Sequence, residues 1–261
     1  MDLEARPTAE QVAALPLGVA RAWGLDEHVR SGPKPGLTLA SITRAAIDLA
    51  DADGLEAVSM ARIASRLGYT TMSLYRYVGS KDELLVLLLD AVTEDALREA
   101  PPVTEGDWRS ALRAWAEEQL AVLLAHPWIL SLRMQGPPMG PNSLAFVERG
   151  LKAVAPLPLH PWERMAVIGL LSSYALSEAR FSVDAADSTL GYGEQLRILV
   201  DPARFPALHA VVESGQLDDV RPPPSGSVDD GTRFGVERIL DGVEALVAPR
   251  LARPENPSQS T

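Results

Sequence analysis

The stretch from Leu39 to Val92 constrains the fold more than any other part of the chain, because short apolar stripes with helical spacing alternate there with glycines and capping residues. The first stripe has the i, i+3, i+4, i+7, i+8 spacing of a helix with one buried face. It consists of Ile42, Ala45, Ala46, Leu49 and Ala50. Thr38 is placed to cap this helix, and Gly54 is placed to end it.

Two shorter helices are predicted next. One runs from Ser59, whose side chain can cap it, to Gly68, which provides the tight turn between two crossing helices. Its inward residues are Ile63, Ala64 and Leu67. The other begins at Thr70 or Thr71 and ends at Gly79. Its inward residues are Leu74 and Val78.

A fourth helix is predicted to start where Ser80 and Glu83 have the spacing of a capping box. Its apolar residues fall on two faces, one made of Leu84, Leu85, Leu88 and Val92 and the other of Val86, Leu87 and Leu89. A helix that is apolar on two sides is buried between two bodies. We therefore expect this helix to join the first three to the core that follows.

The short third helix carries polar and basic side chains on its outer face, which suits a helix that lies in the major groove of DNA. The residues placed to reach base edges are Thr71, Met72, Ser73 and Arg76. Tyr75, Tyr77 and Lys81 are better placed for phosphates, which position a protein without specifying sequence. The spacing alone fits equally an ordinary small helical bundle with a solvated polar face.

The segment LGYTTMSLYRYVGSKDELL, residues 67–85, resembles the recognition-helix signature of the tetracycline-repressor (TetR) family of transcriptional regulators. The matching positions are Leu67, Gly68, Leu74, Tyr75, Tyr77, Val78, Lys81, Leu84 and Leu85, and the run 46–54 also fits. The resemblance implies phosphate contacts from Tyr75, Tyr77 and Lys81 and base reading by residues 70–73. The full set of predicted DNA contacts is Lys34, Arg44, Ser59, Arg62, Thr70, Thr71, Met72, Ser73, Tyr75, Arg76, Tyr77 and Lys81.

Composition sets the class of protein and its compartment. The chain has 261 residues, 46% of them apolar, and no cysteine, which excludes disulfides, thiolate metal sites and a cysteine nucleophile. With no signal peptide and no membrane span in the sequence, we expect it to be cytoplasmic. The net charge is −11, but residues 30–81 carry seven Lys or Arg and four Asp or Glu, a local charge of +3, so the rest carries −14. A basic segment can still attract phosphate locally, and the acidic remainder disfavours anionic small ligands.

The rest of the chain is predicted to be helical throughout, with no β alternation and no glycine-rich phosphate loop. Residues 7–25 form a helix interrupted near Pro16, and two His-Pro-Trp copies, at 126–128 and 160–162, mark helix starts. Two isolated histidines do not make a metal site, so neither a metal nor a cofactor is expected. The predicted fold is all-α, an N-terminal three-helix helix-turn-helix DNA-binding domain followed by a helical ligand-binding and dimerisation domain. Its boundaries are 1–36 for an N-terminal helical extension and basic linker, 37–84 for the helix-turn-helix domain, 85–252 for the second domain and 253–261 for a disordered tail.

The HPW…GPPMGPN arrangement of residues 126–142 resembles regulators with a TetR-like C-terminal ligand-binding domain. That resemblance implies a homodimer built on helices at about 162–185 and 232–248, with Ile239 and Val243 in the contact. The candidates to line the ligand pocket are Trp115, Trp128, Met134, Met139, Phe146, Met165, Tyr174 and Phe181. Any of these can equally be a core residue. In the linker 30–36, a basic arm for the minor groove and a plain linker remain open.

The predicted function is a ligand-responsive transcriptional regulator, a homodimeric repressor that a small molecule releases from a palindromic DNA operator. One alternative is a DNA-binding regulator gated by a protein partner. The other is an all-α enzyme, which the lack of cysteine, the sparse histidines and the lack of a Ser/His/Asp set disfavour. The chain is therefore not expected to be an enzyme.

Overall fold

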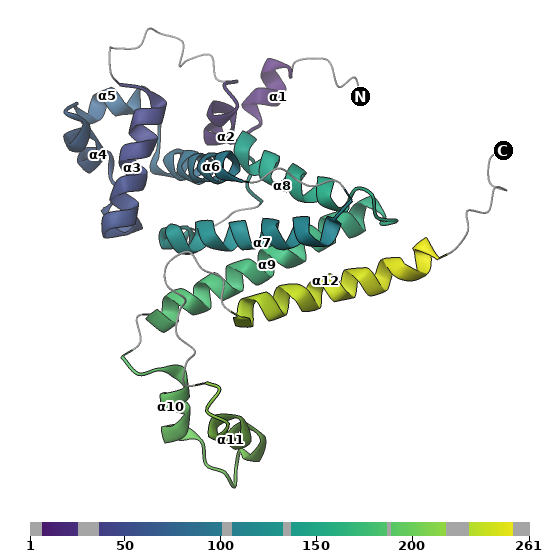
Figure 1. The fold of residues 1–261 in the computed structure, drawn as a ribbon. Helices are drawn as coiled ribbons and strands as arrows, with labels where there is room; N and C mark the ends of the chain where they lie inside the picture. The colour runs from purple at the N-terminus through teal and green to yellow at the C-terminus, as the bar shows by residue number, and fades with distance from the viewer. Residues whose placement is uncertain are drawn as a thin grey trace, which may run out of the picture. The chain divides into compact units, whose positions relative to one another are not determined.

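The computed structural model of this protein describes residues 7–25, 37–100, 106–132, 137–186, 189–217 and 230–252 (Figure 1). All regular elements within these ranges are helices, as the sequence predicts. The chain divides into two compact units, the first drawn from Met1–Ala111 and Ser131–Pro156 and the second from Leu112–Leu130 and Leu157–Thr261. This division assigns residues 131–156 to the same unit as the helix-turn-helix segment, residues 37–84.

The helix-turn-helix segment has the predicted elements. They are α3 (Leu39–Asp53), a short 3-10 helix (Leu55–Ala57), α4 (Met60–Leu67) and α5 (Thr71–Tyr75). The side chains of Thr38, Ser59 and Thr70 cap the three α-helices by accepting hydrogen bonds from backbone N–H groups. Gly68 ends α4 with φ of 73°, a left-handed conformation that glycine adopts without strain. The prediction was wrong at one end, because α5 stops at Tyr75 rather than at Gly79.

The core of this segment is formed by apolar side chains from its helices and from the turn after α5. Ile42, Ile63, Leu74 and Val78 all have 0% exposure. Burial of such side chains stabilises a fold by roughly 1.5–3 kcal/mol each. Leu67, which the pattern also turned inward, is only half-buried. The helical stripes therefore identified the buried face of α3, α4 and α5.

The first unit is completed by α6 (Lys81–Glu99), α8 (Pro141–Val154) and the N-terminal helices α1 (Ala9–Ala13) and α2 (Leu17–Ala22). The break between α1 and α2 falls at Pro16, as predicted. Helix α6 packs against α2, α3 and α8. Leu84, Leu88 and Val92 of one predicted apolar face are buried, as is Leu87 of the other, whereas Val86 and Leu89 are half-buried.

The second unit contains most of α7 (Trp108–Ala125), the 3-10 helix Pro127–Ser131 up to its last residue, α9, α10, α11 and α12. Their bounds are Pro161–Ala186 for α9, Tyr192–Leu199 for α10, Pro206–Glu213 for α11 and Asp230–Leu251 for α12. Both His-Pro-Trp copies lie at helix starts, as predicted. Helices α9 and α12 run side by side, and α10 packs with α11 (Figure 1).

The α9–α12 pair is held by apolar residues along its length and by polar contacts near its ends. The hydroxyl of Tyr174 donates to the carbonyl of Gly231 at 3.3 Å. A Cβ on Gly235 would lie 2.1 Å from that hydroxyl oxygen, so glycine allows the ring to cross α12. At the other end, Arg250 donates to both carboxylate oxygens of Glu163, at 2.7 and 2.8 Å.

One prediction about this pair needs correction. Val243, expected in a contact between two copies, is only 5% exposed within a single chain. It belongs to the inner face of α12 with Val236, Leu240 and Val247. Ile239 is half-buried. Because these residues already contact their own chain, the outward face of α12 is carried by other side chains.

Candidate DNA interface

Helix α5 presents the residues predicted to read bases. Met72 is 74% exposed, and Thr70 is exposed as well. The hydroxyl of Thr70 caps the helix by accepting from the N–H of Ser73 at 3.4 Å, and it lies 2.9 Å from the Ser73 hydroxyl, while Thr71 is half-buried. A base edge that binds the hydroxyl of Thr70 or Ser73 would therefore compete with these hydrogen bonds for the same oxygen atom.

The residues predicted to contact phosphates surround the turn between α5 and α6. Tyr75 is 45% exposed, Lys81 is exposed and Tyr77 is half-buried. Arg76, which is predicted to reach base edges, is exposed beside them. Neither Arg76 nor Lys81 forms an ion pair with another residue that the structure describes. Their charges therefore meet no competing carboxylate in this part of the chain.

The other predicted contacts lie in different surroundings. Arg44 on α3 donates to Asp95 of α6 at 2.7 Å, and Arg62 on α4 donates to Asp53 at 2.5 Å. Ser59 caps α4. Lys34 lies outside the described residues. Both arginines can reach a phosphate only in competition with an acidic partner that the sequence pattern did not identify.

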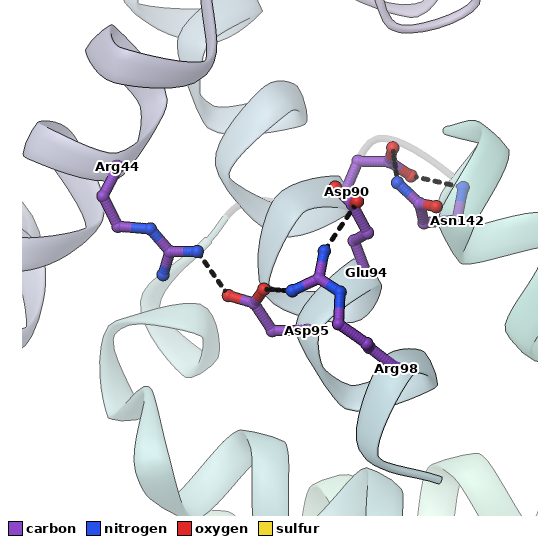
Figure 2. A network of polar contacts seen from close by, with 6 residues as sticks. All are labelled: Arg44, Asp90, Glu94, Asp95, Arg98 and Asn142. Carbon is purple, nitrogen blue, oxygen red and sulfur yellow. Dashed lines mark hydrogen bonds and ion pairs between the residues drawn. The ribbon is translucent and has the colours of Figure 1, made fainter.

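Helix α6 carries a polar network on the side that faces α3 (Figure 2). Asp95 accepts from Arg44 and from Arg98, the latter at 2.8 Å, and Arg98 also donates to Glu94 at 2.8 Å. Partial burial of Asp95 opposes its charge, but the hydrogen bonds and positive charge of Arg44 and Arg98 prevail and lower the pKa of this carboxyl below its ordinary value. The carboxylate therefore stays ionised and holds α3 to α6.

A second polar contact, missed by sequence reasoning, joins α6 to α8. Asp90 is buried, and its carboxylate accepts from the backbone N–H of Asn142 and Ser143, both at 3.0 Å, and from the Asn142 side chain at 2.8 Å (Figure 2). It thus caps α8 from a neighbouring helix. A Cβ on Gly140 would lie 2.0 Å from the same carboxylate, so glycine is required there. The signal in the sequence was one acidic residue among the apolar residues of α6.

The candidate pocket residues are not all in comparable positions. Trp115 and Trp128 are buried, whereas Met139, Met165 and Phe181 are 46 to 53% exposed. Phe146 and Tyr174 are half-buried, and Met134 lies outside the described residues. Met139 and Phe146 belong to the first unit, and the candidates on α7, on the 3-10 helix Pro127–Ser131 and on α9 belong to the second. Within the described ranges no group of three or more His, Cys, Asp or Glu is arranged to hold a metal ion.

Two family models match most of the chain. Residues 42–88 match the bacterial regulatory proteins of the tetR family, and residues 100–247 match the tetracyclin repressor-like C-terminal domain. The chain belongs to the tetracycline-repressor family. This TetR-family protein is therefore a DNA-binding transcriptional regulator, and its relatives are regulators rather than enzymes. No helix within the described ranges is long and apolar enough to span a membrane.

Relatives of this TetR-family protein include transcriptional regulators from two bacteria. The transcriptional repressor DrrR1 of Streptomyces coeruleorubidus is 37% identical over 87% of this chain and 85% of its own length. A transcriptional regulator of Saccharopolyspora erythraea is 34% identical over 77% of this chain and 86% of its own length. Among solved structures, apo ActR of Streptomyces coelicolor has a TM-score of 0.68 at 28% identity, covering 84% of this chain and all of ActR. ActR in complex with actinorhodin has a TM-score of 0.66 at 29% identity, covering 83% of this chain and 99% of ActR.

Proposed function

We propose that this protein is a homodimeric repressor that binds a palindromic DNA operator and is released from it by a small organic molecule. Its similarity to DrrR1, named as a transcriptional repressor, supports the direction of regulation. Its similarity to ActR, whose structure was solved with actinorhodin and with (S)-DNPA, supports a small-molecule effector. Since its target is DNA, the protein acts in the cytoplasm.

The observation that carries the DNA-binding part of the proposal is the support under α5. Leu74 and Val78 have no exposed surface, so they anchor α5 in the core while its outer face stays accessible. Met72 then faces outward at the start of the helix, and Arg76 and Lys81 offer charges that no described carboxylate neutralises. This division suits base reading by residues 70–73 and Arg76, and phosphate contacts by Tyr75, Tyr77 and Lys81.

The dimer part of the proposal rests on the outward face of α9 and α12. Trp162, Met165 and Leu170 on α9 are 69, 53 and 54% exposed, and Phe234 and Leu246 on α12 are 64 and 42% exposed. These side chains leave apolar surface uncovered on both helices within a single chain. A second copy covering this face would bring two helix-turn-helix segments onto one operator, in major grooves about 34–36 Å apart.

For the effector, the buried tryptophans Trp115 and Trp128 are the better supported pocket candidates. Met165 and Phe181, being exposed on α9, suit the contact with a second copy instead. Tyr174 crosses Gly235 of α12, so a role in the pocket would require its ring to move. The effector releases DNA only if it binds the released conformation better than the operator-bound one. We place that change in α6, which contacts both α3 and α8.

The test starts with selection of DNA fragments from a random pool by the purified full-length protein. Enrichment of a palindrome, with a dimer in light scattering at micromolar concentration, supports the proposal. A monomeric protein, or an enriched sequence without two-fold symmetry, contradicts it. Actinorhodin and other small organic molecules are then titrated into the protein–operator complex, with fluorescence anisotropy as the readout. Dialysed cell extract, which keeps proteins but loses small molecules, is tested in the same way. If only a component retained by dialysis releases the protein from the operator, a protein partner controls DNA binding.

A further inference from the structure

The N-terminal helix α2 reaches the turn that follows α5, although it lies outside the matched helix-turn-helix segment 42–88. One guanidinium nitrogen of Arg21 donates to the carbonyl of Tyr77 at 3.0 Å and to the carboxylate of Glu83 at 2.7 Å. The Arg21 and Glu83 side chains are only 10 and 11% exposed. This is a nearly buried ion pair between residues 62 positions apart in the sequence.

The same carboxylate also fixes the other side of the turn. Ser80 caps α6 by accepting from the N–H of Glu83 at 3.1 Å, as the capping box predicts. The Glu83 carboxylate, however, accepts from the N–H of Gly79 at 2.8 Å. The backbone from Tyr77 to Glu83 is thus held at three points, and Arg21 supplies the only donor of the three that comes from outside the helix-turn-helix segment.

Helix α2 is packed closely enough to hold Arg21 in place. A Cβ on Gly18 would lie 3.0 Å from the Cα of Glu83 and 3.3 Å from the Cβ of Val86, so the first turn of α2 touches α6 directly. At the other end of α2, the indole N–H of Trp23 donates to the carbonyl of Met139 at 2.8 Å. With both ends of α2 anchored, Arg21 is oriented before any DNA is present.

We propose that Arg21 is a positioning residue for operator binding, which holds the Tyr77–Glu83 turn so that Tyr75, Tyr77 and Lys81 meet the phosphate backbone together. The inference rests on the proposed DNA-binding function. Arg21 itself does not contact DNA, because its guanidinium is enclosed by Tyr77 and Glu83. A family member with a different N-terminal region would have to stabilise this turn in another way.

The experiment measures binding of full-length variants to a duplex carrying the sequence that the wild type selects from a random pool. Fluorescence anisotropy is recorded across a range of salt concentrations, at a temperature well below each melting point. We expect Arg21→Ala to weaken binding roughly tenfold, because a carbonyl and a carboxylate lose a nearly buried donor. The salt slope should stay at the wild-type value, since no phosphate contact is removed.

Three further variants separate positioning from other roles. Gly18→Ala pushes α2 away from α6 without changing charge, and it should weaken binding in the same way. The double variant Arg21→Ala, Glu83→Gln should lose little more than the worse single variant, because the two side chains act through one contact. Lys152→Ala removes the same charge from an exposed site on α8, where the side chain is 68% exposed, and it should bind as the wild type does.

Two results overturn the inference. Wild-type affinity for both Arg21→Ala and Gly18→Ala would mean that α2 does not position the turn. A salt slope that falls by about one for each half-site in Arg21→Ala would mean that Arg21 contacts a phosphate itself. Failure of the wild type to bind any duplex would contradict the proposed function instead, and that outcome is visible before any variant is made.

Discussion

The helix-turn-helix segment and the α9–α12 pair bury their apolar side chains in different ways. In the first, apolar residues lie on one face and disappear from the surface, as Leu74 and Val78 do at 0% exposure. In the second, α9 buries Ile168 and Leu171 yet leaves Leu170 54% exposed on its other side. A single chain therefore completes the core of the helix-turn-helix segment but leaves the α9–α12 pair with one apolar face uncovered.

This difference separates two tasks. The outer side of α5 and of the turn after it carries Arg76 and Lys81, which suits a highly charged partner that is bound reversibly. The outer sides of α9 and α12 carry several large apolar side chains that a single chain leaves exposed, and exposed apolar surface of that kind marks an interaction site. Substitutions on the two outer faces should therefore impair different properties of the protein, DNA contact in the first case and association of two copies in the second.

The largest effect is expected on the α9–α12 face. Leu170→Glu and Phe234→Glu each place a charge within the proposed contact between two copies, so both should yield monomers by light scattering. Loss of the second half-site should weaken operator binding by about 10²-fold or more. The melting temperature of the monomer, measured at low protein concentration, should change little because both side chains are exposed. Leu144→Glu, an exposed leucine of α8, is the control and should remain dimeric.

An intermediate effect is expected at the phosphate contacts. Lys81→Ala and Tyr75→Phe should weaken every DNA sequence alike, by roughly tenfold, because phosphate contacts carry no sequence information. Lys81→Ala should also lower the salt slope by about one for each half-site. Both variants should remain dimers. Selection from a random pool should return the wild-type operator, and a changed operator would mean that these residues read bases.

The sequence predicted the helix-turn-helix segment well because its rules are local. Thr38, Ser59 and Thr70 cap helices that begin within a residue or two, and Gly68 needs only its own backbone angle. Glu83 shows where local rules stop. Its predicted partner was the start of its own helix, but its carboxylate binds Gly79 and Arg21, and Arg21 is far away in the sequence.

The α9–α12 pair could not be predicted to the same depth, because apolar residues occur on all sides of both helices. Periodicity then fails to say which side faces the same chain, and Val243 was assigned to the wrong face. The pocket residues could not be predicted for the same reason. In the sequence, a tryptophan that fills a core, such as Trp115, cannot be distinguished from one that lines a binding site. The role of Asp90, the acidic residue that interrupts the apolar run of α6, is seen only once α8 is placed beside it.

A smaller effect, present at neutral pH and lost in acid, is expected where α9 and α12 are joined by an ion pair. Hydrogen bonds from Arg250 and from the N–H of His160 lower the pKa of Glu163 to about 2, from an ordinary value of 4.5. A carboxyl whose pKa is lower in the folded state stabilises the fold at pH values above the unfolded pKa. This contribution is present above about pH 4.5 and disappears as the pH falls toward 2.

Glu163→Gln should therefore lower the melting temperature at neutral pH and leave it close to that of the wild type near pH 2. The measurement is the melting temperature against pH by circular dichroism. Glu148→Gln removes a carboxylate from an exposed pair with Lys152, where Glu148 is 58% exposed, and serves as the control. An equal difference from wild type at both ends of the pH range would mean that Glu163 contributes through shape rather than charge.

The smallest effect is expected at Arg44, and it decides how the helix-turn-helix segment is attached to α6. Arg44 is basic and lies in the DNA-binding segment, but it pairs with Asp95 at 2.7 Å, with side chains 56 and 31% exposed. Exposed pairs of this kind contribute less than about 1 kcal/mol. Arg44→Ala should then bind operator within about twofold of wild type, with an unchanged salt slope. If Arg44 instead contacts a phosphate, the slope should fall by about one for each half-site. Asp95→Asn also distinguishes these two possibilities, because it removes the charge that pairs with Arg44. It should strengthen operator binding only if the Asp95 carboxylate competes with DNA for Arg44.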